Sequence, residues 1–294
     1  SKKFTFFYPG NINQKTGGYI YENNIFKFSK KNKFPIKFIE LTSNYPNPNI
    51  QDIKNLNKLT SNIKSDNILI FDGLVLEGLD KSTDIFDNFK IIALIHHPLY
   101  LEFKGKKSEV FFKRAVKIYK KINYFIVTSL STKKLLSKTF HINSNKISIV
   151  EPGIEKFKIY KKTLSTKVKI LSCGSIIERK KYDYLIKEVQ NIENIELHLV
   201  GDVSRESKYT SKIKKIISKN NLKSKVILHG KIAQVKLEKL YSNCDFYIST
   251  SEYEGFGMAL ASAALSKLPI ISYKTETIQK TIGKDGVLYF DNHN

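Results

Sequence analysis

The sequence is poor in the residues that mark disulfide-rich and membrane-spanning proteins. It holds two cysteines, one methionine and no tryptophan in 294 residues. Cys173 and Cys244 lie far apart in apolar contexts, without a cysteine or histidine at metal-ligand spacing, so we expect two buried free thiols. No apolar run approaches the about eighteen residues of a membrane-spanning helix, and the longest strong one, Ile91–Ile95, suits a buried strand.

Acidic residues are also scarce, with 27 Asp and Glu against 50 Lys and Arg and a net charge of +23. This charge permits binding to nucleic acid, anionic lipid or an acidic substrate, but lysines spread along the whole chain, as a compositional bias would also produce. No recognised nucleic-acid module is present, so nucleic acid is not the expected partner. Too few apolar residues precede Pro9 for a signal peptide, which favours a cytoplasmic protein.

Short apolar runs alternate with helical patterns from end to end, which predicts parallel sheets built of βα units. The first series of expected strands is Phe4–Tyr8, Ile36–Leu41, Asn67–Phe71, Lys90–Ile95, Tyr124–Val127 and Ile147–Val150. The second series is Val168–Cys173, Ile195–Val200, Val226–Leu228, Phe246–Ser249, Ile270–Tyr273 and Val287–Phe290. Glu151–Lys167 lies between them without a strong hydrophobic period and is predicted to be a linker.

This alternation predicts an α/β protein with two Rossmann-like, doubly wound domains at residues 1–155 and 156–294. Ligands of such domains bind at the carboxyl ends of the parallel strands, so we expect a site in the cleft between the two sheets. No internal sequence repeat and no low-complexity tail accompanies this duplication.

The most informative motif is Glu254-Gly255-Phe256-Gly257, between a predicted strand and a helix. Glycines allow close backbone approach to a ligand, and the following helix start favours an anion. A lone loop glutamate is more often a solvated charge, but the flanking glycines favour a binding role. Ser262 follows Glu254 by eight positions, a spacing that would put both on one helix face.

This stretch resembles the donor-site signature of the retaining GT-B glycosyltransferases of family 4. The resemblance implies a GT-B fold in which Glu254 binds the donor sugar and the loop Gly255–Gly257 borders the diphosphate. It fails at Ser262, where the family has a second glutamate that holds the nucleotide ribose, and at Lys267, where it has a glycine. A serine cannot make the same charge-assisted contact, so we expect weaker donor binding there.

A second match opens the second domain, where Gly174 and Ser175 precede Arg179 and Lys180. In the family an arginine and a lysine hold the donor diphosphate. Lys180 fits the lysine position, Ser175 replaces the common arginine, and Arg179 offers a guanidinium nearby. A solvated basic turn is the alternative for these cations taken alone.

In the first domain, Gly17 and Gly18 open a predicted helix and resemble the family's loop beside the donor phosphates, although a plain turn explains them as well. His96 ends a predicted strand where many members carry a histidine beside the donor sugar; a structural strand terminus is the alternative. The adjacent His97 projects differently and no carboxylate set is apparent, so no metal site is expected. The loop of Gly230 and Ile232 is expected beside the nucleotide base.

The segment 111–122 places apolar residues at helical spacing opposite five cations. Such a helix can lie on an anionic membrane, or its apolar side can pack on the sheet. The first interpretation would place the protein peripherally on the inner face of the membrane, with a lipid-linked acceptor.

Taken together, the resemblance predicts a retaining transferase that moves a hexose from a nucleoside diphosphate sugar, with a UDP-sugar expected, to an unidentified acceptor. Glu254, His96 and Lys180 are the expected catalytic residues, and no cofactor or metal is expected. No Asp-x-Asp triplet occurs, which disfavours a metal-dependent GT-A enzyme. Ser175, Ser262 and an end soon after Phe290, where the family continues with further helices, favour the alternative of a shortened, non-catalytic module that binds nucleotide sugars or polyanions.

Overall fold

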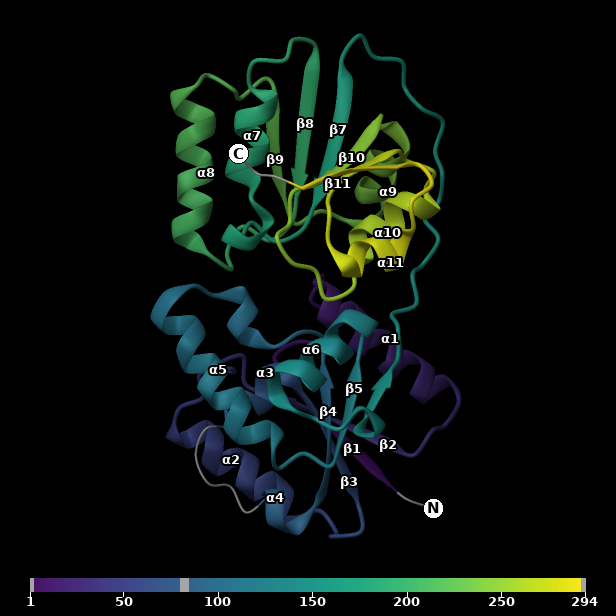
Figure 1. The fold of residues 1–294 in the computed structure, drawn as a ribbon. Helices are drawn as coiled ribbons and strands as arrows, with labels where there is room; N and C mark the ends of the chain where they lie inside the picture. Colours follow the sequence, from purple (N-terminus) through teal and green to yellow (C-terminus); the bar gives the residue numbers. More distant parts are fainter. Residues whose placement is uncertain (1–2, 80–84, 292–294) are drawn as a thin grey trace. The chain divides into compact units, whose positions relative to one another are not determined.

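The computed structural model describes residues 3–79 and 85–291, which form two compact units (Figure 1). Unit 1 is Ser1–Gly153 and unit 2 is Ile154–Asn294. Each unit contains one six-stranded sheet in which all paired strands are parallel. The α/β class and the doubly wound arrangement predicted from the sequence are confirmed.

Unit 1 has the strand order β2-β1-β3-β4-β5-β6. Its strands are β1 (Phe4–Pro9), β2 (Ile36–Leu41), β3 (Ile68–Asp72), β4 (Lys90–Ile95), β5 (Tyr124–Val127) and β6 (Ile147–Ile149). Its helices are α1 (Gly17–Lys31), α2 (Ile50–Ser61), α3 (Gly73–Leu76), α4 (Ile85–Asn88), η1 (Leu99–Glu102), α5 (Gly105–Tyr119), α6 (Leu130–Phe140) and η2 (Ser144–Lys146).

Unit 2 has the strand order β12-β11-β10-β7-β8-β9. Its strands are β7 (Val168–Cys173), β8 (Ile195–Val200), β9 (Val226–Gly230), β10 (Phe246–Ser249), β11 (Ile270–Tyr273) and β12 (Val287–Phe290). Its helices are η3 (Glu178–Lys180), α7 (Tyr182–Val189), α8 (Ser207–Lys219), α9 (Gln234–Asn243), α10 (Met258–Leu265) and α11 (Glu276–Ile282). Every strand expected from the sequence is present, with ends that differ by at most two residues.

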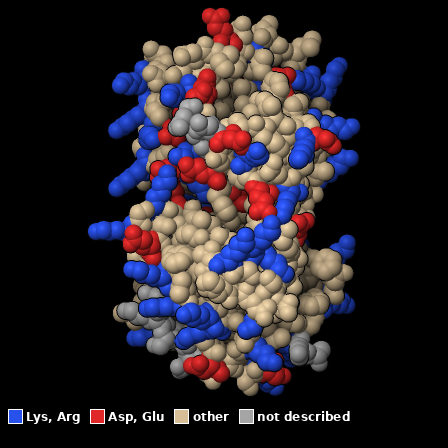
Figure 2. Space-filling view, in the orientation of Figure 1, with Lys and Arg blue, Asp and Glu red and all other residues tan. Residues whose placement is uncertain are grey.

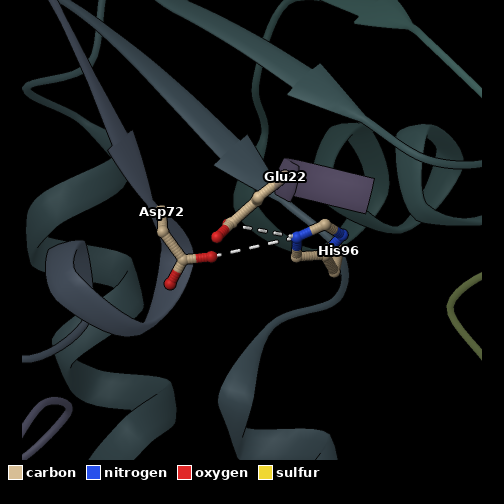
Figure 3. A group of neighbouring side chains, drawn as sticks. All are labelled: Glu22, Asp72 and His96. Carbon is tan, nitrogen blue, oxygen red and sulfur yellow. Dashed lines mark ion pairs between the residues drawn. The ribbon is translucent and has the colours of Figure 1, made fainter. Parts of the chain in front are cut away.

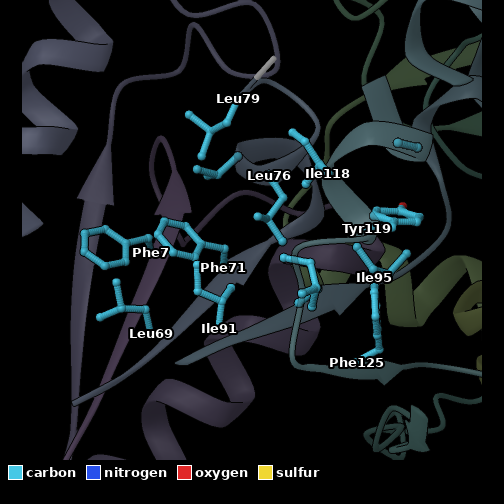
Figure 4. Close-up of a cluster of buried hydrophobic side chains, with 14 of the residues drawn as sticks. Phe7, Leu69, Phe71, Leu76, Leu79, Ile91, Ile95, Ile118, Tyr119 and Phe125 are labelled. Carbon is cyan, nitrogen blue, oxygen red and sulfur yellow. The ribbon is translucent and has the colours of Figure 1, made fainter. Parts of the chain in front are cut away.

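Successive side chains along each strand point to opposite faces of the unit 1 sheet, and a hydrophobic core forms on each face. Phe7, Phe71 and their neighbours on one face pack against helices α2, α3 and α5, as Figure 4 shows for the larger side chains. Phe7 and Phe71 stack with ring centroids 4.8 Å apart. Phe6 and Tyr8 point to the other face, where they pack with Tyr21 of α1. This period of two is what a sheet covered on both faces requires.

The same alternation divides the core of unit 2. Ile170 packs with residues of α7 and α8, whereas Leu171, the next residue of β7, packs with residues of α9, α10 and α11 (Figure 1). Cys244 is buried and Cys173 is half-buried, and both thiols are free, as expected from their apolar contexts. These cores fix the carboxyl ends of the strands, on which the candidate site is built.

Helix α5 buries the apolar stripe that we considered for membrane binding. Phe111, Ala115 and Ile118 are at most 3% exposed. Lys113 and Lys117 stay exposed on the opposite side. The apolar side of this helix is therefore packed inside unit 1, as the second interpretation expects. Over residues 3–79 and 85–291, no helix combines the length and the apolar character that crossing a bilayer would require.

Lysines and arginines cover both units rather than one patch on the face drawn in Figure 2. Acidic side chains lie scattered among them (Figure 2). On the face in view the cations are therefore not gathered in one patch, as the compositional interpretation expects.

Lys267 occupies the position where the family signature has glycine, and its backbone is left-handed with φ of 57°. A side chain in this conformation costs about 1 kcal/mol relative to glycine. Lys267→Gly is therefore expected to raise the free energy of unfolding by up to about 1 kcal/mol in urea denaturation. Lys284→Gly, at an exposed loop position without a positive φ, is the matched control and should not stabilise. Equal effects of the two substitutions would contradict the assignment of strain to Lys267.

Two histidines on neighbouring strands of unit 2 lie side by side. His198 Nδ1 of β8 is 2.9 Å from His229 Nε2 of β9, and the two rings stack. Burial, followed by the charges of His198 and Lys236, lowers the pKa of His229 to about 4. Burial also lowers the pKa of His198 despite the nearby Glu196 carboxylate. The folded state therefore favours neutral imidazoles at this pair.

This pair is expected to make unit 2 less stable in mild acid. The unfolded chain takes up protons here near pH 6.5 and the folded chain only at lower pH, so stability present above pH 6.5 is lost as the pH falls toward 4. His229→Gln should reduce that loss by about 1 kcal/mol, a value discounted because the ring is only half-buried. Urea denaturation of both proteins at pH 7 and pH 4.5 measures it, and an identical pH dependence would refute the assignment.

Candidate functional site

The candidate site of unit 2 is built on two loops that follow adjacent strands. One loop runs from Gly174 after β7 to the short helix η3, and the other runs from Thr250 after β10 to α10. Strands β7 and β10 pair directly and in parallel, so their carboxyl ends lie at the same edge of the sheet. The two motifs singled out from the sequence therefore meet, although 74 positions separate Lys180 from Glu254.

Lys180 and Glu254 form the centre of this cluster. Lys180 Nζ lies 2.5 Å from Glu254 Oε1, and Arg179 Nη1 lies 3.7 Å from Glu254 Oε2. All three side chains are only 11–12% exposed. Isolated charges at such depth would be costly, so each is stable there only because the opposite charge is beside it.

The electrostatics of the cluster keep Glu254 ionised. Burial alone would raise the pKa of Glu254, but Lys180 and Arg179 outweigh it and hold this pKa at about 2. Burial lowers the pKa of the Lys180 ammonium, and the Glu254 carboxylate opposes that effect. A carboxylate fixed in its charged form can only accept hydrogen bonds, which suits it to hold hydroxyl groups.

Backbone contacts lock the two loops together. Thr250 Oγ1 donates to the Lys180 carbonyl at 2.7 Å, and the Glu252 amide donates to the Arg179 carbonyl at 3.0 Å. Arg179 Nη1 donates to the Tyr253 carbonyl. Arg179 Nε, in contrast, is buried without a hydrogen-bond partner among the described residues. A buried guanidinium donor left unused in this way is available to an anionic ligand.

Glycines make the close approach of these loops possible. A Cβ on Gly174 would lie 2.7 Å from Lys180 Cε and 3.2 Å from the Tyr182 hydroxyl, which donates to the Gly174 carbonyl at 3.1 Å. A Cβ on Gly201 would lie 1.9 Å from the carbonyl oxygen of Gly174. The positions of Gly174 and Lys180 therefore depend on the absence of two side chains.

Helix α10 begins after Gly257, whose φ of 93° ends the loop Gly255–Gly257. The Phe256 carbonyl accepts from Thr281 Oγ1 at 2.7 Å, which ties the loop to α11. The expected spacing of Glu254 and Ser262 on one helix face is wrong, because Glu254 lies four residues before the helix starts. Ser262 is half-buried on α10, and its carbonyl accepts from the Ser266 amide.

The remaining residues expected at the donor lie at the same edge of the sheet. Ser175 is half-buried directly after Gly174. Gly230 ends β9, and its carbonyl accepts from the Gly201 amide at 3.0 Å. Ile232 packs on the core beside α9 and α10. The binding roles of Ser175, Gly230 and Ile232 stay predictions.

In unit 1 the structure brings Gly18 and His96 together. Gly17 and Gly18 open α1 as expected, and a Cβ on Gly18 would lie 3.2 Å from His96 Cδ2. Two carboxylates that the sequence analysis missed, Glu22 and Asp72, face the same imidazole (Figure 3). Asp72 ends β3 next to β4, so alignment of the strand ends could have indicated it. Nothing in the local sequence marks Glu22.

Comparisons with known proteins agree with this architecture. Residues 154–294, the whole of unit 2, match the sequence profile of the family described as Glycosyl transferases group 1. The chain is similar to the UDP-N-acetylglucosamine–peptide N-acetylglucosaminyltransferase GtfA subunit of Limosilactobacillus reuteri subsp. suis, at 25% identity over 223 residues. That alignment covers 72% of this chain and 43% of the relative, so the chain spans less than half the length of that curated protein.

Solved structures resemble the chain over nearly its whole length. Sucrose-phosphate synthase from Thermosynechococcus elongatus has a TM-score of 0.76 at 16% identity, covering 98% of this chain and 86% of that one. Anabaena HepE in complex with UDP and glucose has a TM-score of 0.74 at 14% identity, covering 100% and 86%. These likenesses show the fold. The chain therefore has the GT-B fold of glycosyltransferases, and unit 2 is similar to the group 1 glycosyl transferases.

Proposed function

We propose that this protein transfers a hexose from a nucleoside diphosphate sugar to an acceptor, with retention of the anomeric configuration. The observation that carries the proposal is the buried cluster of Arg179, Lys180 and Glu254 at the carboxyl ends of β7 and β10. It combines two cations, an ionised carboxylate and an unused guanidinium donor in one small space. The profile match of unit 2 and the cluster support the same reaction class.

The two cations can stabilise the negative charge that develops during this reaction. Departure of the nucleoside diphosphate builds negative charge on phosphate oxygens, which Lys180, Arg179 and the first amides of α10 stabilise. In the structure Glu254 pairs with both cations and balances one of their two positive charges. A bound diphosphate replaces it as their counter-charge and frees the Glu254 oxygens for the hydroxyl groups of the donor sugar. The leaving phosphate oxygen then accepts the proton of the acceptor hydroxyl on the same face of the sugar.

A UDP-sugar is the proposed donor. The relative named above is a UDP-N-acetylglucosamine-dependent enzyme by its name, and the HepE structure contains UDP and glucose. Ser262 replaces the second glutamate of the family signature, so other groups must hold the nucleotide ribose. The predicted role of His96 beside the donor sugar stays a prediction.

The acceptor stays open between a glycan, a peptide and a lipid. The apolar side of α5 is buried, so attachment of this helix to a membrane would depend on its exposed lysines alone. Such an electrostatic contact contributes about 1 kcal/mol per cation and weakens with salt. Contact with anionic lipid is therefore proposed only as a salt-sensitive, peripheral interaction.

Release of nucleoside diphosphate from UDP-glucose, UDP-N-acetylglucosamine and GDP-mannose tests the proposal. Glu254→Gln should lower the rate at least about 100-fold, the scale of losing one stabilising group at a reacting centre. Glu252→Gln removes an exposed carboxylate two residues away and should leave the rate within about twofold. Equal activity of Glu254→Gln and the native protein would contradict the proposal, and binding without release from any donor would favour the non-catalytic module.

A further inference from the structure

Three side chains of unit 1 form a largely buried cluster, and the predicted role of His96 beside a donor sugar does not explain its two carboxylates. Glu22 comes from α1, Asp72 ends β3, and His96 follows β4 (Figure 3). His96 Nε2 lies 3.5 Å from Glu22 Oε1 and 3.8 Å from Asp72 Oδ2. Figure 3 shows both carboxylates directed at this nitrogen. One ligand atom from each residue lies within 4.8 Å of the others, the one such group among the described residues.

The surroundings hold these groups in place. Asp72 Oδ1 accepts from the Leu74 amide at 2.7 Å, which leaves Oδ2 directed at His96. The His96 carbonyl accepts from Thr128 Oγ1 at 3.2 Å, which fixes the backbone behind the imidazole. The ring of Tyr21 stands edge-on to the imidazole with centroids 5.4 Å apart. The cluster therefore does not depend on flexible surface side chains.

The hydrogen bonding of the cluster is incomplete. Glu22 Oε1 and His96 Nε2 are buried and have no hydrogen-bond partner within residues 3–79 and 85–291, and Glu22 is 1% exposed. Two carboxylates at this depth require either protons or a cation. A cation would satisfy both carboxylates and the imidazole at once.

The spacing suits a small divalent ion. Tetrahedral zinc with ligands at about 2.1 Å has neighbouring ligand atoms about 3.4 Å apart. The distances of 3.5 and 3.8 Å need only a small contraction to reach this value. One imidazole nitrogen with two carboxylate oxygens favours a first-row transition ion over magnesium or calcium, which prefer oxygen ligands alone.

We propose that Glu22, Asp72 and His96 bind a divalent transition-metal ion, with Zn²⁺ as the expected occupant and water as the fourth ligand. The ion links α1 to the carboxyl ends of β3 and β4. It thereby also fixes the start of α1 at Gly18, which lies beside His96. Zinc binding can be measured without any ligand at the donor site in unit 2. It was not expected from the sequence, because the two carboxylates lie far from His96 along the chain.

Calorimetric titration of the tag-free, chelator-treated chain with Zn²⁺ tests the site. One ion per chain should bind, and the melting temperature should rise with zinc concentration because only the folded state offers the site. Glu22→Gln and Asp72→Asn, which keep shape and remove charge, should each weaken binding by more than about 100-fold, beyond the 10–100-fold typical of outer-shell losses. Co²⁺ should give an absorption spectrum that disappears in both variants.

Two histidine variants serve as matched controls. His97→Gln changes the neighbouring imidazole, which pairs with Glu102, and His229→Gln changes the histidine pair of unit 2. Both should bind zinc like the native chain. Absence of zinc binding to the native chain would overturn the proposal, as would binding that survives in Glu22→Gln and Asp72→Asn but is lost in His229→Gln. Circular dichroism and nucleotide binding by unit 2 confirm that each variant is folded.

Discussion

Gly201→Ala is expected to prevent unit 2 from reaching its native structure. The new Cβ would lie 1.9 Å from the carbonyl oxygen and 2.4 Å from the carbonyl carbon of Gly174, both backbone atoms that cannot turn away. Gly201 also has a φ of 155°, a conformation almost restricted to glycine. Backbone overlap and dihedral strain together should cost about 4 kcal/mol or more, a large share of the stability of a domain.

Hydrogen exchange followed by mass spectrometry measures this effect locally. Peptides from α7 and α10 should lose protection in Gly201→Ala, and peptides from the unit 1 sheet should lose much less. Gly153→Ala is the control, since a Cβ there meets nothing within 4 Å. Native protection of α7 in Gly201→Ala would mean that the close approach of Gly174 and Gly201 is not a requirement of the fold.

Lys180→Met is expected to weaken nucleotide-sugar binding at least about tenfold and to destabilise unit 2. Methionine keeps much of the side-chain volume but leaves the buried Glu254 carboxylate with Arg179 alone, 3.7 Å away. Removing one partner of a buried ion pair costs about 3–5 kcal/mol, and the remaining guanidinium places this case at the low end. Urea denaturation should show a loss of about 3 kcal/mol.

The double variant Lys180→Met with Glu254→Gln separates stability from binding. It removes both charges, so stability should return to within about 1 kcal/mol of the native value. The native affinity for the nucleotide should not return, because the Lys180 ammonium that contacts the diphosphate is still missing. If the double variant is as unstable as Lys180→Met, the ion pair is not the source of the destabilisation. If the double variant binds UDP like the native chain, Lys180 is not part of the binding site.

The sequence predicted the strands well because their signal is local. The apolar runs of β1, β4 and β7 follow from sheets covered on both faces, and each run is complete within six residues. The resemblance at Glu254 and Lys180 also predicted that both residues bind the same donor. Parallel pairing of β7 with β10 then brings them together, as a doubly wound order allows.

Other features of the sites depend on contacts that a sequence does not display. The start of α10 depends on the left-handed Gly257, so counting residues from Glu254 misplaced Ser262 relative to the loop. The contact of Gly201 with Gly174 joins two strand ends, and no motif marks Gly201 as the partner of Gly174. Glu22 looks like an ordinary helical carboxylate, and only the packing of α1 on the sheet places it beside His96.

Calorimetric titration of the native chain with UDP and UDP-hexoses, beside Lys180→Met and Lys181→Met, tests the central claim most directly. Lys181 is adjacent to Lys180 and has the same charge, but it pairs with the exposed Glu252. The native chain and Lys181→Met are expected to bind UDP with the same affinity. Lys180→Met is expected to bind UDP at least about tenfold more weakly, which corresponds to the loss of one charge-assisted hydrogen bond. Equal binding by Lys180→Met and Lys181→Met, or no binding by the native chain at millimolar concentrations, would contradict this claim.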